Sequence, residues 1–229
     1  MTQIPDYKAI IFDMDGLILD TEATYIRAWQ LAAMEFGYVI NDTFCTSMSG
    51  LPFSQVEEKF AEYLGDQFPL AEFYTLSGKL WREVAENEGI AVKKGAYDLI
   101  QMLAEAGTPF CLATNSPEFN ARECLRYAGI EDLFSQIVCR DHVPQAKPAA
   151  DIFIRAADLM QQPIQSCLVI EDSLTGLLAA KNAHAFSVLI PSTPDTDGQM
   201  QALAGLVVND LCELSLLLHG GNKSVHNPV

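Results

Sequence analysis

The sequence has 229 residues, of which 49% are hydrophobic and 19% are charged, a composition typical of a globular protein and not of a disordered or fibrous one. Thirty acidic residues against fourteen basic ones give a formal net charge of −16 at pH 7. Because such a charge repels polyphosphate backbones and anionic membrane surfaces, we expect neither a nucleic acid nor a membrane as a partner.

The first apolar run of the chain covers residues 9–12 (AIIF) and stops at Asp13. It is too short for the core of a signal peptide, and no later run approaches the roughly 20 residues that cross a membrane. A short apolar run that ends in polar residues predicts a buried β-strand. The six cysteines lack the CxxC spacing of zinc or redox sites. We therefore expect a cytoplasmic protein with reduced thiols, and a monomer is favoured.

The next part of the chain, from residue 17 to about residue 91, contains no predicted buried strand and is dominated by helical patterns. Helices are predicted over residues 21–36 and 53–64, with Asp20 as the N-cap of the first. Some seventy residues of helix are too many for a simple connection and enough for a small domain. We expect an inserted helical cap over residues 18–91, a core formed by residues 1–17 and 92–221, and a polar tail over residues 222–229.

The remaining chain alternates between apolar runs and helical patterns. The predicted strands cover residues 110–113, 136–139, 167–170, 187–190 and 206–208, and the predicted helices cover residues 118–128, 149–160 and 174–183. This alternation predicts an α/β fold with a doubly wound parallel sheet.

Ligands of doubly wound sheets bind at the carboxyl ends of the strands, so the polar residues that follow each strand are the candidate site residues. They are Asp13, Asp15, Thr114, Asn115, Ser116, Lys147, Glu171 and Asp172. Crowded carboxylates need a cation, and oxygen ligands of this kind select magnesium. The alternation of side chains along a strand places Asp13 and Asp15 on the same side, so that one carboxylate can attack while the other handles a proton.

The order of four motifs along the chain resembles the haloacid dehalogenase superfamily of aspartyl-phosphate phosphotransferases. The motifs are FDMDG at residues 12–16, ATNS at residues 113–116, Lys147-Pro148, and VIEDS at residues 169–173. The resemblance implies a Rossmann-like core with the helical cap of the first subclass. It also implies a role for each candidate residue.

In this family the first aspartate is the nucleophile and the second is the general acid and base, which maps these roles onto Asp13 and Asp15. Thr114 and Lys147 would bind the transferring phosphoryl group, with help from Asn115 and Ser116. The family's metal ligands map onto the side chains of Asp13, Glu171 and Asp172 and onto the backbone carbonyl of Asp15.

Two of these residues have a simpler interpretation. Thr114 could be the N-cap of the helix that follows it. Glu171 could be only a local hydrogen-bond acceptor, because adjacent strand residues point to opposite faces and the strand must bend for both Glu171 and Asp172 to reach one ion. Asp172 is therefore the better ligand.

The leading hypothesis is a magnesium-dependent phosphatase that hydrolyses a small phosphomonoester, either a sugar, polyol or nucleotide phosphate, through an aspartyl-phosphate. The first alternative is a sugar phosphomutase similar to β-phosphoglucomutase. Such mutases carry an arginine just beyond a cap glycine, whereas residues 49–53 here contain no cation. The second alternative, a phospho-accepting receiver domain, takes its phosphorylated aspartate after the third strand and is disfavoured by the motif order.

Overall fold

The computed structural model describes residues 4–48, 53–65 and 67–221 and divides into two compact units. The larger unit contains the described residues up to Leu19 and from Val92 onward, and the smaller unit is Asp20–Ala91. The chain passes between them through two short strands, β2 (Leu19–Asp20) and β3 (Ala91–Val92), which pair with each other. No strand was expected at β2. A two-residue strand is too short to leave an apolar pattern, which explains why the sequence did not predict it.

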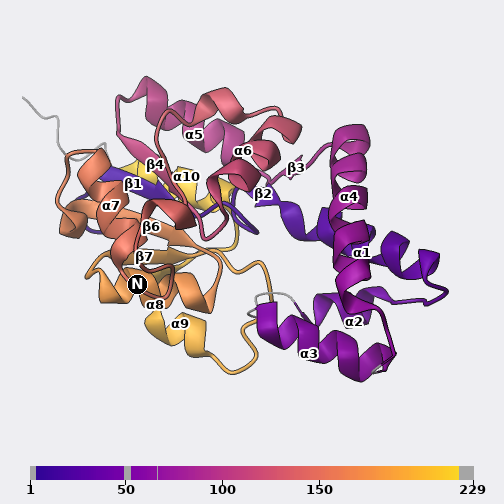
Figure 1. Ribbon diagram of the computed structural model, residues 1–229. Coiled ribbons are helices and arrows are strands. Elements are labelled where there is room, and N and C mark those ends of the chain that lie inside the picture. Colours follow the sequence, from indigo (N-terminus) through magenta and orange to yellow (C-terminus); the bar gives the residue numbers. More distant parts are fainter. Residues whose placement is uncertain (1–3, 49–52, 66, 222–229) are drawn as a thin grey trace, which may run out of the picture. The chain divides into compact units, whose positions relative to one another are not determined.

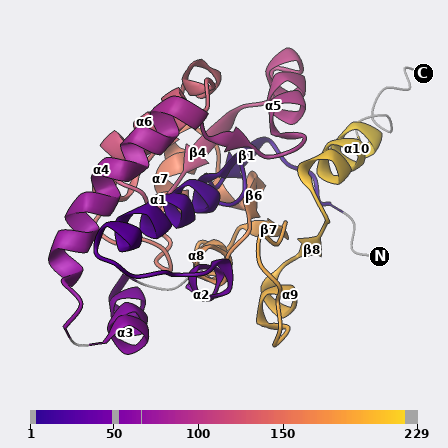
Figure 2. The ribbon, with the colours of Figure 1, turned by 90° about the vertical axis from the view of Figure 1, so that its right-hand side faces the viewer.

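The larger unit is built on a six-stranded parallel sheet whose strand order is β5-β4-β1-β6-β7-β8 (Figure 1). The strands are β1 (Ala9–Phe12), β4 (Phe110–Ala113), β5 (Ile137–Val138), β6 (Cys167–Glu171), β7 (Phe186–Leu189) and β8 (Leu206–Val207). Figure 2 shows β4, β1, β6 and β7 following one another across the sheet. The predicted α/β class and all six apolar runs are confirmed. Strand β1 lies between β4 and β6, so its carboxyl end is at the middle of the sheet edge.

Helices cover both faces of this sheet. They are α5 (Ala96–Glu105), α6 (Glu118–Tyr127), α7 (Asp151–Leu159), α8 (Leu174–Asn182), α9 (Gln199–Leu203) and α10 (Leu211–Gly221). Short 3-10 turns occur at Glu131–Leu133, Arg140–His142 and Ile164–Ser166. Helices α5 and α10 pack together on the face opposite α7 and α8 (Figure 1). The central strands β1, β4, β6 and β7 are buried on both faces, as expected for near-continuous apolar runs in a parallel sheet.

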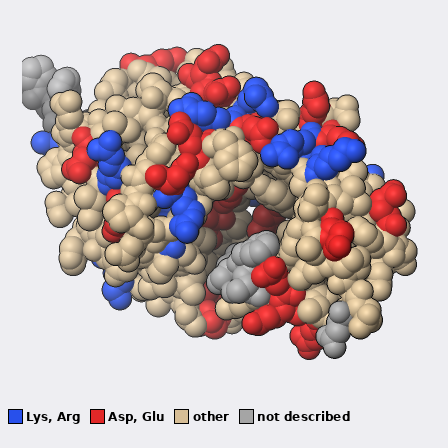
Figure 3. Space-filling model, in the orientation of Figure 1, with Lys and Arg blue, Asp and Glu red and all other residues tan. Residues whose placement is uncertain are grey.

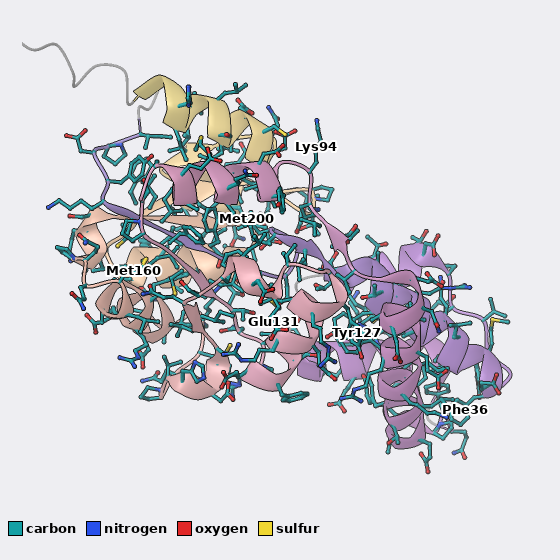
Figure 4. All side chains as sticks on the ribbon, turned by 90° about the horizontal axis from the view of Figure 1, so that it is seen from above. Phe36, Lys94, Tyr127, Glu131, Met160 and Met200 are labelled. Atoms are coloured by element: carbon teal, nitrogen blue, oxygen red, sulfur yellow. The ribbon has the colours of Figure 1, made fainter. Side chains whose placement is uncertain are left out.

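One buried cluster fixes α7 and α8 against the sheet. It joins alternate residues of the central strands, such as Ile11 and Val169, to Phe153 of α7 and Ala180 of α8, and it extends to Met160, labelled in Figure 4. A smaller cluster places Met200 of α9, also labelled, against residues of α8 and β7. These packed contacts fix the positions of the strand ends, and of the loops that follow them, relative to one another.

The smaller unit is helical. Its described helices are α1 (Thr21–Glu35), α2 (Asp42–Thr46), α3 (Phe53–Leu64) and α4 (Leu70–Glu88). Helices α1 and α4 pack against each other, and an aromatic core around Phe60, Phe68 and Phe73 joins the unit. Asp20 stands at the N-cap position of α1, but its side chain accepts no capping hydrogen bond, contrary to expectation. Its ψ of 69° is outside the extended region that N-cap residues adopt.

None of the helices in the described part of the chain is long and apolar enough to cross a membrane. All six cysteines are free thiols, as expected.

Candidate active site

Strand pairing continues one residue beyond the central strands and holds the first site residues. The backbone N–H of Asp13, just after β1, donates to the Ile170 carbonyl of β6 at 3.0 Å. The N–H of Thr114, just after β4, donates to the Val138 carbonyl of β5 at 3.0 Å. Both residues are buried, so the predicted strand ends place two polar side chains at adjacent positions in the protein interior.

Three carboxylates meet at this edge of the sheet. Asp13, Glu171 and Asp172 each offer a carboxylate oxygen, and these oxygens all lie within 4.8 Å of one another. Strand β6 ends at Glu171, so the rule that adjacent strand residues point to opposite faces does not apply to Asp172. The chain bends after Glu171, and this bend allows the carboxylates of Glu171 and Asp172 to approach each other. Gly16, with a φ of 82°, leaves the room that Asp172 occupies, because a Cβ there would lie 2.2 Å from Asp172 Oδ2.

Lys147 is the buried cation that faces these acids. Its Nζ donates to Asp13 Oδ1, to Glu171 Oε1 at 2.7 Å and to the Ala113 carbonyl at 2.8 Å, and it lies 4.9 Å from the ring centroid of Phe153. The ammonium group has three hydrogens, and each has an acceptor. Burial lowers the pKa of Lys147, but the charges of Asp13 and Glu171 outweigh burial and raise that pKa above its usual range. The lysine therefore stays protonated.

Glu171 is held by donors on both of its oxygens. While Oε1 faces Lys147, Oε2 accepts from the N–H of Asp172 at 3.2 Å and from the N–H and hydroxyl of Ser173 at 3.3 and 3.0 Å. The carboxylate lies against α8, where a Cβ on Gly176 would be 1.8 Å from its Cδ. Because Oε2 accepts three hydrogen bonds, Oε1, which accepts from Lys147, is the oxygen better placed to face a metal ion.

The carboxylates carry more negative charge than Lys147 can offset. Burial raises the pKa of Asp13 well above its usual range, and the acids around it add to this rise while Lys147 opposes it. Burial also raises the pKa of Asp172 to about 7, with a further contribution from Glu171 and an opposing hydrogen bond from Ser192. Three buried carboxylates against one ammonium group are a donor set that fits a divalent cation with a preference for oxygen.

Asp15 faces the second motif. Its Oδ2 accepts from the hydroxyl of Thr114 at 3.1 Å and from the hydroxyl of Ser116 at 3.0 Å. The Thr114 hydroxyl also accepts from the Ser116 N–H at 3.0 Å. Helix α6 begins at Glu118 with Pro117 at its N-cap position, so the interpretation of Thr114 as the N-cap is wrong.

Asn115 lies beside these residues and pairs with the backbone of Lys147. Its Oδ1 accepts from the Lys147 N–H at 2.9 Å, and its Nδ2 donates to the Lys147 carbonyl at 3.2 Å. Asn115 thus fixes the loop that carries the lysine, whose bond to Pro148 is cis. The structure brings all eight candidate residues to the same edge of the sheet.

Sequence reasoning missed three residues of this site. Ser192 follows β7 in the same way that the other candidates follow their strands, so the rule that collected them could have found it. Phe153 and Gly176 lie within helices, where an apolar residue and a glycine give no sign that they support a lysine and a glutamate.

The sequence matches the family of haloacid dehalogenase-like hydrolases over residues 7–184. It is 35% identical over 221 residues to the bifunctional riboflavin kinase/FMN phosphatase of Arabidopsis thaliana, covering 91% of this chain but only 55% of that longer protein. It is 30% identical over 186 residues to a fructose-1-phosphate phosphatase of Escherichia coli, covering 77% of this chain and 93% of the relative. The fold is similar to that of a putative β-phosphoglucomutase from Thermotoga maritima, with a TM-score of 0.77, 25% identity, and coverage of 95% and 100% of the two chains.

Proposed function

The chain belongs to the haloacid dehalogenase-like hydrolases and is a phosphoric monoester hydrolase, and on this basis we propose that it is a magnesium-dependent phosphatase acting through a phosphorylated Asp13. The observation that carries the proposal is the setting of Asp13. It is a buried carboxylate at the end of the central strand, paired with Lys147 and within 4.8 Å of two further acids.

Asp13 is the nucleophile. Lys147 donates to its Oδ1, which favours the ionised form, and strand pairing on β6 fixes its backbone. One oxygen of the carboxylate attacks phosphorus, the bond from phosphorus to the ester oxygen breaks, and the phosphoryl group is transferred to Asp13.

Asp15 is the general acid and base. It gives a proton to the departing ester oxygen, which leaves as an alcohol, and it then takes a proton from a water molecule. The oxygen of that water attacks phosphorus and breaks the bond to Asp13. Inorganic phosphate leaves, and both aspartates return to their starting state.

The phosphoryl group is bound by the hydroxyls of Thr114 and Ser116 and by the charge of Lys147. Asn115 and Glu171 support this set, because the first anchors the lysine loop and the second accepts a hydrogen bond from the lysine side chain.

A magnesium ion would be held by the side chains of Asp13 and Asp172, Oε1 of Glu171 and the backbone carbonyl of Asp15. When bound, it supplies positive charge that offsets the negative charge of the carboxylates and of the phosphoryl group. This ligand set agrees with the excess of buried carboxylates over buried cations in the described part of the site.

We propose a sugar, polyol or nucleotide phosphate as the substrate, because the two relatives named above are phosphatases of FMN and of fructose 1-phosphate. The smaller unit, Asp20–Ala91, is the proposed helical cap. The cytoplasm is the proposed compartment, and no nucleic acid or membrane partner is proposed.

A phosphomutase is the second candidate, favoured by the similarity of the fold to a putative β-phosphoglucomutase. The sequence of residues 49–53 argues against it because it contains no cation for a second phosphate. Residues 49–52 lie outside the described part of the chain.

The test is a screen of the purified protein with magnesium against a panel of phosphomonoesters, with release of inorganic phosphate as the readout. A phosphatase releases phosphate in proportion to the substrate consumed. Isomerisation of a sugar phosphate without phosphate release would favour the mutase, and no turnover of any monoester would contradict both.

A further inference from the structure

The two hydroxyls that would bind the phosphoryl group already have an acceptor in the protein. Thr114 Oγ1 and Ser116 Oγ donate to the same atom, Asp15 Oδ2, at 3.1 and 3.0 Å. A hydroxyl has a single hydrogen to donate. Neither group can therefore donate to a phosphoryl oxygen while it keeps its bond to Asp15.

The backbone on both sides holds this contact in place. The turn after Asp15 is closed by the bond from the Gly16 N–H to the Leu19 carbonyl at 2.8 Å. The Thr114 hydroxyl is oriented by the bond it accepts from the Ser116 N–H, which leaves its hydrogen directed at Asp15. Thr114 is fully buried, so water cannot replace the lost acceptor if Asp15 leaves; another acceptor must take its place.

We propose that the Asp15 carboxylate occupies the hydroxyl donors of the phosphoryl site in the unliganded enzyme and is displaced by the phosphoryl group. The inference rests on the proposed function and extends it. Substrate binding would then release the Asp15 carboxylate from Thr114 and Ser116, and the freed carboxylate takes up a proton from solvent before it serves as the general acid. In the absence of a phosphoryl group, Asp15 would be held by these donors.

The competition predicts a coupling between Asp15 and each hydroxyl in the binding of phosphate. In the wild type, phosphate must break the bond from Ser116 to Asp15 before it can accept from Ser116. In Asp15→Ala nothing has to be broken, and in Ser116→Ala there is no such bond. The gain in affinity on removing Asp15 should therefore be larger when Ser116 is present. The loss of a negative charge also strengthens anion binding, but by the same factor in both backgrounds.

The experiment measures the dissociation constant of inorganic phosphate by calorimetry, at saturating magnesium and fixed pH. The proteins are wild type, Asp15→Ala, Ser116→Ala and the double variant, with melting temperatures to check that each is folded. A hydrogen bond to a charged group predicts that Asp15→Ala tightens phosphate binding about tenfold more with Ser116 than without it. A second cycle with Thr114→Val should show coupling of the same sign and serves if a Ser116 variant does not fold. The exposed Ser135 gives a matched control, because Ser135→Ala should show no coupling to Asp15.

The proposal would be overturned if Asp15→Ala tightened phosphate binding by the same factor with and without the hydroxyl, for both Ser116 and Thr114. The phosphatase assignment would not be affected by that result. If the folded wild type and all variants failed to bind phosphate with magnesium present, the proposed function itself would fall, and this inference with it.

Discussion

Asp13 lies in a setting in which burial and charge act against each other. Burial and the neighbouring acids raise its pKa, while Lys147 holds it toward the ionised form that a nucleophile needs. Lys147 is in turn fixed by Glu171 and the Ala113 carbonyl. The reactivity of one residue thus depends on a small set of buried partners that come from three other parts of the chain.

Replacement of Asp13 by Asn keeps the size of the side chain and removes the attacking charge. We expect phosphate release by Asp13→Asn to fall by about three orders of magnitude or more, with the far-ultraviolet circular dichroism unchanged. An initial-rate assay with the best substrate of the panel measures the effect. A folded variant that keeps a tenth of the wild-type rate would remove Asp13 from the role of nucleophile.

The pKa of Asp172, raised from 3.8 to about 7, makes the stability of the metal-free protein depend on pH. Between these two pKa values the folded protein keeps the proton that the unfolded chain releases. The contribution of this proton to the free energy of unfolding is complete below the unfolded pKa and is lost as the pH rises through the folded pKa. The decrease is at most about 1.4 kcal/mol per pH unit.

Urea unfolding in chelator at pH 5, 6 and 7 measures this dependence, and Asp172→Asn is the control because it cannot titrate there. The wild type should lose stability relative to Asp172→Asn as the pH rises. Parallel curves for the two proteins would show that Asp172 has no raised pKa.

At the scale of the element, α8 shows how a helix can be shaped by a side chain from a neighbouring strand. Its Gly176 lies against the Glu171 carboxylate, and an added Cβ would be 1.8 Å from Cδ of that side chain. Alanine favours a helix over glycine by about 1 kcal/mol. Here that preference is outweighed, because Glu171 would have to leave Lys147 and the donors of residues 172 and 173.

We therefore expect Gly176→Ala to lower the melting temperature by several degrees and the rate of phosphate release by at least about tenfold. Gly78 in α4 offers a matched control, since nothing lies within 4 Å of a Cβ built there. Gly78→Ala should raise the melting temperature slightly and leave activity unchanged. If the two variants behaved alike, the packing of Glu171 on α8 would not constrain the site.

The sequence predicted those elements that leave a strong pattern. All six strands of the main sheet were located because each is a short apolar run, and α3 was predicted at its observed bounds. Helix α4 was not singled out, although Pro69 and Gly89 mark its two ends. Strand β2 was missed because it is only two residues long. The site was predicted from strand ends, which is why Phe153 and Gly176, which lie within helices, were found only in the structure. Ser192 follows β7 and was within reach of the same rule.

At the scale of the whole molecule, charge is the property that the site must overcome. The chain carries a formal charge of −16, with acidic and basic side chains interspersed over the surface seen in Figure 3. Diffuse repulsion of this kind is relieved by any salt. The three buried carboxylates are a separate, local excess of charge, which a proton or an ion bound at the site relieves and diffuse salt does not.

Magnesium should therefore stabilise the protein in a saturable way. A ligand that binds only the folded state contributes about 2.7 kcal/mol at a hundredfold excess over its Kd, which is about 5–10 °C in melting temperature for a chain of this size. Sodium chloride at matched ionic strength should raise the melting temperature less than magnesium does. The extra rise caused by magnesium should be reduced more by Asp172→Asn than by Glu171→Gln, because Oε1 of Glu171 is shared with Lys147. Equal shifts for the two salts in wild type and variants would show that these acids hold no specific ion.

The central claim is that the phosphoryl group passes through Asp13, and trapping that covalent state tests it most directly. The enzyme with magnesium and excess substrate is quenched in acid during turnover, digested, and mapped by mass spectrometry. The account predicts one phosphorylated peptide, with the phosphoryl group on Asp13, sensitive to hydroxylamine and absent from Asp13→Asn. A phosphorylated residue other than Asp13, or substrate turnover by Asp13→Asn at a rate close to that of the wild type, would contradict it.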